Sequence, residues 1–262
     1  MKLIHCADSF KDSRDSIVSG NGCMGKQSGR IVTFLRLVKY ALNTSVKALL
    51  IMGDLFCPEE MNTELQEVLM TCIEKNPELE FCFLSGEDEA EPLSELLHGE
   101  LKNVKVLEKG NIVRMDENLV ITGAEGAEAL SETDVNLVAV REEGKPEIWA
   151  GKHIDYLAFC DGSYRELRLE KRGYMVSPGY IFSGGESKSG FVELELSDGV
   201  LKHRYVRFSP ERGVPILEQE TFRYDISLKG EFTRLVMDTD ISEDDKQVIL
   251  GMGERALTGS EP

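Results

Sequence analysis

Short apolar segments alternate with amphipathic segments through the first 160 residues, and this alternation restricts the fold more than any other feature. The apolar segment at 46–52 ends at Gly53-Asp54, and the next apolar segment covers 79–84. Between them, residues 61–72 repeat apolar side chains every three to four positions, which is the spacing of an amphipathic helix. Strand, helix and strand in this order predict a layered α/β domain with a mainly parallel sheet.

The same pattern predicts the other elements. Strands are expected at 2–7, 46–52, 79–84, 104–107, 112–114, 119–122, 135–140 and 156–159, with helices over 31–42 and 58–72 and a loop over 12–29. After residue 160 shorter, antiparallel strands are expected at 166–169, 174–176, 191–196 and 201–208, with a turn at 197–199. A last helix is expected within 238–257.

The charge of the chain restricts its partners. The sequence has 30 Lys and Arg against 47 Asp and Glu, a net charge of −17. This balance argues against a general affinity for DNA, although it does not forbid a local basic patch. There is no apolar run of the roughly 20 residues that a bilayer requires and no signal-peptide pattern, so we expect a cytoplasmic protein without a membrane partner. The six cysteines lack CxxC spacing, which favours reduced thiols.

Acidic residues follow several of the predicted strands. Asp8, Asp54 and Asp161 come directly after apolar segments, and a run of acids occupies 87–89. Ligands of α/β sheets bind at the carboxyl ends of the strands, and clustered carboxylates suit a hard cation. For any single turn, a solvated loop acid is the simpler interpretation.

These turns also form an ordered series of motifs. The series consists of His5-Cys6-Ala7-Asp8-Ser9-Phe10, Gly53-Asp54-Leu55-Phe56-Cys57, Ser85-Gly86-Glu87-Asp88-Glu89, residues 155–163 and Ser177-Pro178-Gly179. It resembles the series of the calcineurin-like metallophosphoesterases and, among them, of SbcD-type DNA-repair exonuclease subunits. The resemblance implies a four-layer α/β fold, a sandwich of two sheets flanked by helices, over residues 1–208. Residues 209–262 would then form a short, truncated capping-like extension.

The resemblance also implies which residues would line the site. Members of the family hold two transition-metal ions, usually Mn, which activate a water and clamp the phosphate. Asp8 and Asp54 match ligand positions. The remaining family ligands are replaced, and the matched positions hold Phe10, Cys57, Glu87, Asp88, Arg141, Asp161 and Ser163. The chain has four histidines, and none falls on a ligand position.

Two interpretations follow from these replacements. In the first, the scaffold persists while catalysis is impaired or lost, and Arg141 neutralises Asp8 or Asp54. In the second, Asp8, Asp54, Asp88 or Glu87, and Asp161 form an oxygen-ligand site for a weakly bound Mn or Mg, with phosphodiesterase or exonuclease activity. The first interpretation predicts a binding or regulatory role in a DNA-repair-type complex. Whether the protein is an enzyme stays open at this point.

Three further features have alternative interpretations. Cys6, Cys57 and Cys160 could bind zinc, or they are small core residues. The basic cluster at 165–172 is a solvated face or a contact for the DNA backbone. The apolar residues of the last helix, Val248, Ile249 and Met252, could dock an SbcC-type ATPase, as the resemblance implies, or pack on the chain's own domain.

Overall fold

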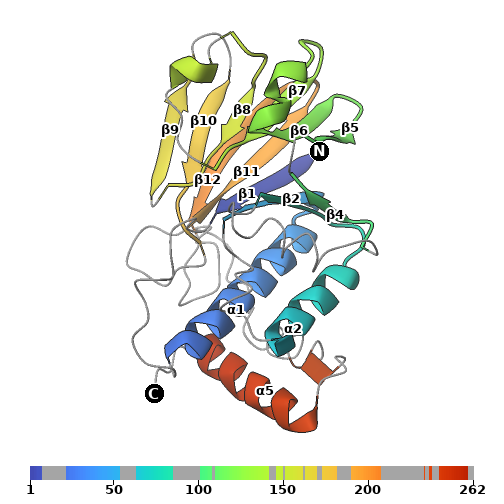
Figure 1. Cartoon of the computed structure of the whole chain (residues 1–262), viewed down its shortest axis with the longest axis vertical. Helices are drawn as coiled ribbons and strands as arrows, with labels where there is room; N and C mark the ends of the chain where they lie inside the picture. Colours follow the sequence, from blue (N-terminus) through green and yellow to red (C-terminus); the bar gives the residue numbers. More distant parts are fainter. Residues whose placement is uncertain are drawn as a thin grey trace.

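The computed structural model describes residues 1–7, 22–53, 63–84, 101–107, 110–141, 146–149, 151–161, 163–169, 173–181, 190–207, 233, 236–237 and 242–258. These residues form two six-stranded sheets that pack face to face, with α-helices on the outer side of one sheet and short 3-10 helices on the outer side of the other (Figure 1). No helix within these ranges is both long and apolar enough to cross a membrane.

The first sheet, sheet A, has the strand order β12-β11-β1-β2-β3-β4. Its strands are β1 (Lys2–Ala7), β2 (Ala48–Met52), β3 (Glu80–Leu84), β4 (Val104–Val106), β11 (Gly190–Ser197) and β12 (Val200–Arg207). Strands β1 to β4 are parallel, and the β11–β12 hairpin adds antiparallel strands beside β1. All five residues of β2 are apolar and buried, as expected for a central strand that is covered on both faces.

The second sheet, sheet B, has the order β5-β6-β7-β8-β10-β9. Its strands are β5 (Ile112–Asp116), β6 (Leu119–Gly123), β7 (Val135–Ala139), β8 (Tyr156–Ala158), β9 (Tyr164–Arg168) and β10 (Tyr174–Pro178). The four inner strands are parallel, and the edge strands β5 and β9 are antiparallel to their neighbours.

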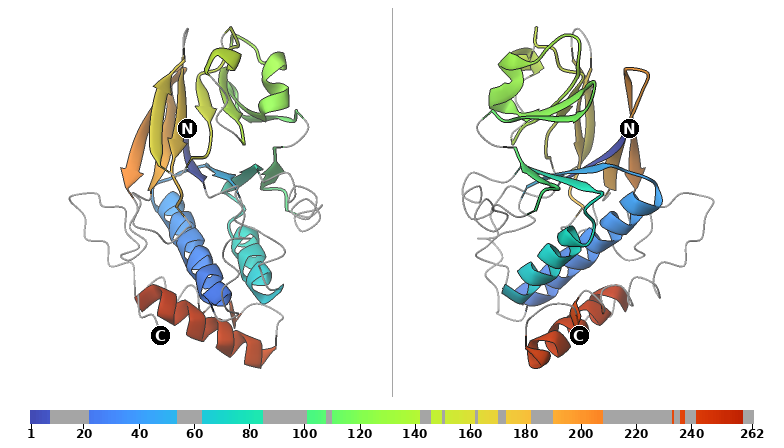
Figure 2. Two further views of the ribbon diagram at one scale, coloured as in Figure 1. Left: turned by 60° about the vertical axis from the view of Figure 1, so that its left-hand side comes forward. Right: turned by 90° about the vertical axis from the view of Figure 1, so that its right-hand side faces the viewer.

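Helical segments cover the outer faces of both sheets, which gives four layers (Figures 1 and 2). Helices α1 (Gly22–Asn43) and α2 (Thr63–Glu74) lie on sheet A, and α5 (Glu243–Thr258) packs against α1 and α2 on the side away from the sheet (Figure 2). The 3-10 helices η2 (Ala124–Ala129) and η3 (Pro146–Trp149) lie on sheet B. A separate apolar core fills each interface: one between the helices and sheet A, one between the sheets and one under the 3-10 helices. The predicted α/β sandwich flanked by helices is therefore confirmed.

Most predicted elements are present with small shifts at their ends; one prediction was wrong and another was confirmed only in part. Residues 22–29 were expected in a loop but form the start of α1. Their glycines lower helix propensity, but extending an established helix costs far less than starting one. Strand β10 was expected in an antiparallel arrangement, but it pairs antiparallel with β9 only and runs parallel to β8.

The turn predicted between β11 and β12 is confirmed. Ser197 and Val200 are register partners, so Asp198 and Gly199 form a two-residue loop. Both have positive φ, 52° and 74°, as a type I′ hairpin turn requires.

Candidate functional site

The carboxyl ends of the parallel strands of both sheets meet at one edge, which we call the carboxyl edge. Ala7, the last residue of β1, forms a parallel bridge with Tyr180, which follows β10. The Ile181 N–H donates a hydrogen bond of 2.9 Å to the Ala7 carbonyl oxygen. The end of β10 in sheet B therefore lies beside the end of β1 in sheet A, where an α/β sheet is expected to bind its ligands.

The strands that precede the acidic turns converge at this edge. Asp8 follows Ala7 directly, and Asp54 follows Gly53, whose N–H donates to the carbonyl oxygen of Leu84 at the end of β3 (3.0 Å). The predicted site residues Asp8, Phe10, Asp54, Cys57, Glu87 and Asp88 themselves lie outside the described residues. Their clustering therefore stays a prediction.

Asp161 is the candidate metal ligand that the described residues include, and its carboxylate already has a cationic partner. Nη1 of Arg165 donates to Oδ2 of Asp161 at 2.9 Å. Arg165 lies on β9, in register with Ser177 on β10, and its side chain contacts the segment of chain that follows β8. The basic cluster predicted from the sequence thus contributes at least one side chain to the carboxyl edge.

A buried serine fixes the backbone around Asp161. The Ser177 side chain is fully buried, and its Oγ accepts hydrogen bonds from the N–H groups of Asp161 (2.9 Å) and Gly179 (3.3 Å). The same hydroxyl lies 3.2 Å from the Asp161 carbonyl oxygen, to which it donates. The Ser177 hydroxyl therefore links the chain segments that leave β8 and β10.

Replacing Ser177 by alanine should destabilise the fold by about 2 kcal/mol, because the buried Gly179 N–H and the partly buried Asp161 N–H both lose their acceptor. Thr122→Val is the matched control, since the buried Thr122 hydroxyl makes one bond, to the Asn111 carbonyl oxygen at 2.6 Å. Urea unfolding of both variants measures the difference. Equal destabilisation would contradict the role assigned to Ser177.

Arg141 and Ser163 also lie at the carboxyl edge. Ala139 at the end of β7 and Ala158 at the end of β8 are register partners. Arg141 follows Ala139 by two residues and Cys160 follows Ala158 by two residues, so Arg141 lies level with Cys160. A fixed positive charge therefore stands beside the end of β8, at the position where the family resemblance expects a histidine. Ser163 is exposed in the connection between β8 and β9.

The described part of the edge does not fit a bound cation. Among the described residues, no three His, Cys, Asp or Glu side chains gather closely enough to hold a metal ion. The Asp161 carboxylate is paired with Arg165, and a divalent cation would compete with that guanidinium for the same oxygens. The zinc alternative gains no support, because Cys6 packs under the helices of sheet A while Cys160 packs against the core between the sheets.

A buried histidine and a buried tyrosine meet between the sheets, a pairing that no sequence motif indicated. His5 of β1 is fully buried, and its Nδ1 lies 2.9 Å from the Tyr156 hydroxyl of β8. Burial lowers the pKa of His5 to about 3 and raises that of Tyr156. Within the described part of the chain, Nε2 of His5 has no hydrogen-bond partner. The imidazole is therefore neutral at physiological pH, and it lies between the sheets as part of the core.

A polar and aromatic seam continues from this pair to the outer strands of the two sheets. The His203 ring packs edge-on against Tyr156, and its Nε2 lies 3.3 Å from Oε2 of Glu166. The Tyr164 hydroxyl donates to the same carboxylate at 2.7 Å, which lowers the pKa of Glu166. These side chains join β12 of sheet A to β9 of sheet B, so the seam is a structural feature of the sandwich.

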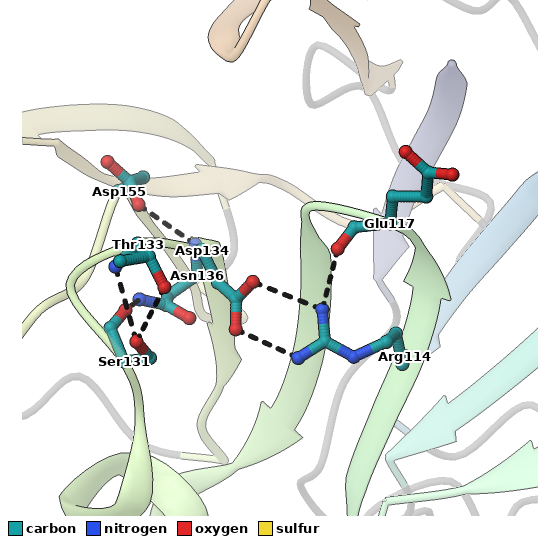
Figure 3. Close-up of polar contacts among 7 residues, drawn as sticks. All are labelled: Arg114, Glu117, Ser131, Thr133, Asp134, Asn136 and Asp155. Carbon is teal, nitrogen blue, oxygen red and sulfur yellow. Dashed lines mark hydrogen bonds and ion pairs between the residues drawn. The ribbon is translucent and has the colours of Figure 1, made fainter.

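The opposite end of sheet B carries a second arginine–aspartate pair (Figure 3). Arg114 of β5 donates to both carboxylate oxygens of Asp134 at 3.1 and 2.9 Å and to the carbonyl oxygen of Glu117 at 2.8 Å. Beside it, the N–H of Asn136 donates to Oδ2 of Asp155 at 2.8 Å. These contacts hold the turns at the amino ends of β6, β7 and β8, far along the strands from the carboxyl edge.

The last helix packs on the chain's own domain with part of its apolar surface. Ile249 is 2% exposed within the core between the helices and sheet A, whereas Val248 is 49% exposed. Of the apolar face predicted for a partner, Ile249 faces inward and Val248 faces outward, and the Met252 side chain lies outside the part of the chain whose side chains the structure describes.

Comparison with known proteins finds similarity in structure only. No family model matches the sequence, and no curated protein is significantly similar to it. TT1561 of Thermus thermophilus is 11% identical, with a TM-score of 0.50, and the match covers 78% of this chain and 98% of that one.

Two further solved structures match more loosely. A conserved protein of Streptococcus pneumoniae, described as a predicted phosphoesterase, is 12% identical over 79% of this chain and 88% of its own, with a TM-score of 0.38. A novel archaeal phosphodiesterase is 11% identical over 79% of this chain and 100% of its own, with a TM-score of 0.36. At these identities the similarity concerns the fold alone, and the chain shares the layered α/β fold of TT1561.

Proposed function

We propose that this chain is a divergent, SbcD-like protein of the metallophosphoesterase type, with impaired catalysis and a binding or regulatory role. The ordered motif series at the strand ends supports the family. The ion pair between Asp161 and Arg165, 2.9 Å apart, supports the loss of catalysis. This pair occupies an oxygen that an all-carboxylate metal site would need.

The charges around this pair favour the same conclusion. Metal-dependent phosphoester hydrolysis needs cations that polarise the phosphate and lower the pKa of a bound water. Arg141 follows β7 beside the end of β8, and a fixed guanidinium charge there disfavours a second cation nearby. Neither arginine can activate a water as a metal does, since a guanidinium does not give up its proton in proteins.

The setting of this role is also a proposal. A DNA-repair-type complex with an SbcC-type ATPase follows from the family resemblance, and α5 would provide the contact. The exposed Val248 side chain is available for such a contact, while the burial of Ile249 makes the apolar part of the contact small. Co-purification with the ATPase, and its loss in Val248→Asp, would support this partner, whereas an unchanged yield would count against α5 as the contact.

An activity assay with added metal tests the proposal. In the presence of added Mn, the purified protein should hydrolyse a small phosphodiester and single-stranded DNA no faster than its Asp54→Ala variant does. Any rate common to both proteins then comes from contamination or from the metal alone. A Mn-dependent rate that falls at least tenfold in Asp54→Ala would overturn impaired catalysis and support the oxygen-ligand site.

A further inference from the structure

We draw no further inference here: the strongest candidate, the cluster of aromatic side chains around the Glu166 carboxylate where the outer strands β9, β10 and β12 of the two sheets meet (Tyr164, Tyr174, His203 and Tyr205), carries none, because its rings pack against one another and nothing in the described part of the chain shows what covers it.

Discussion

His5→Gln should make the stability of the protein much less sensitive to acid. The folded protein holds His5 neutral with a pKa of about 3, against 6.5 for the unfolded side chain. Below pH 6.5 the unfolded chain takes up a proton that the folded chain refuses, so wild-type stability falls with pH until about pH 3. Within this window the group costs up to about 1.4 kcal/mol per pH unit. Glutamine does not titrate, so the variant lacks this contribution.

Urea unfolding at pH values between 4 and 8 measures this difference. Other titrating groups contribute equally to both proteins, so the wild-type and His5→Gln curves should diverge only below about pH 6.5. Parallel curves for wild type and His5→Gln would show that the fold tolerates a charged His5.

Gly173→Ala should be among the most destabilising single-methyl additions in the chain, at about 3 kcal/mol or more. Gly173 has a φ of 87°, and a Cβ there would lie 2.5 Å from the carbonyl oxygens of both Ile154 and Asp155. The Asp155 oxygen accepts a hydrogen bond from the Tyr174 N–H at 3.1 Å. The methyl group would therefore force β10 away from β8, and with it the segment that holds Ser177.

Gly151→Ala separates this crowding from backbone strain. Gly151 has a similar φ of 82°, but a Cβ there would meet nothing within 4 Å. This variant should lose only about 1 kcal/mol, the cost of a left-handed conformation for an alanine. Thermal and urea unfolding of the two variants should differ clearly. Similar losses would mean that the segment around Gly173 relaxes without disturbing β10.

The fold could be predicted largely because its central strands are buried on both faces. The segment ALLIM in β2 leaves few alternatives to a covered parallel strand. The pairing of β10 could not be predicted, because its sequence fits either direction. The close approach that Gly173 permits beside Asp155 is visible only in three dimensions. The start of α1 was hidden for a different reason, since glycine-rich composition outweighed the continuity of the helix.

The candidate site was harder to predict than the fold. The ends of β1 and β10 lie together as the strand pattern suggested, whereas most of the acidic residues predicted to follow the strands lie outside the described residues. The partner of Asp161 was missed because Arg165 was assigned to a solvated basic cluster. Arg165 follows Asp161 by four residues, a spacing that predicts an ion pair within a helix but not in the non-helical segment where these two residues lie. Ser177 was quoted only as part of a Pro-Gly motif, although a serine just before such a turn often bonds to backbone N–H groups.

The two sheets differ in how their strands are distributed along the chain, and this bears on synthesis. All strands of sheet B come from residues 112–178, whereas sheet A combines β1 to β4 with β11 and β12. Strand β1 pairs with residues 192–195 of β11, so its contacts span most of the polypeptide. Local pairing is fast and distant pairing is slow. During synthesis on the ribosome, sheet B can therefore assemble before β11 emerges and pairs with β1.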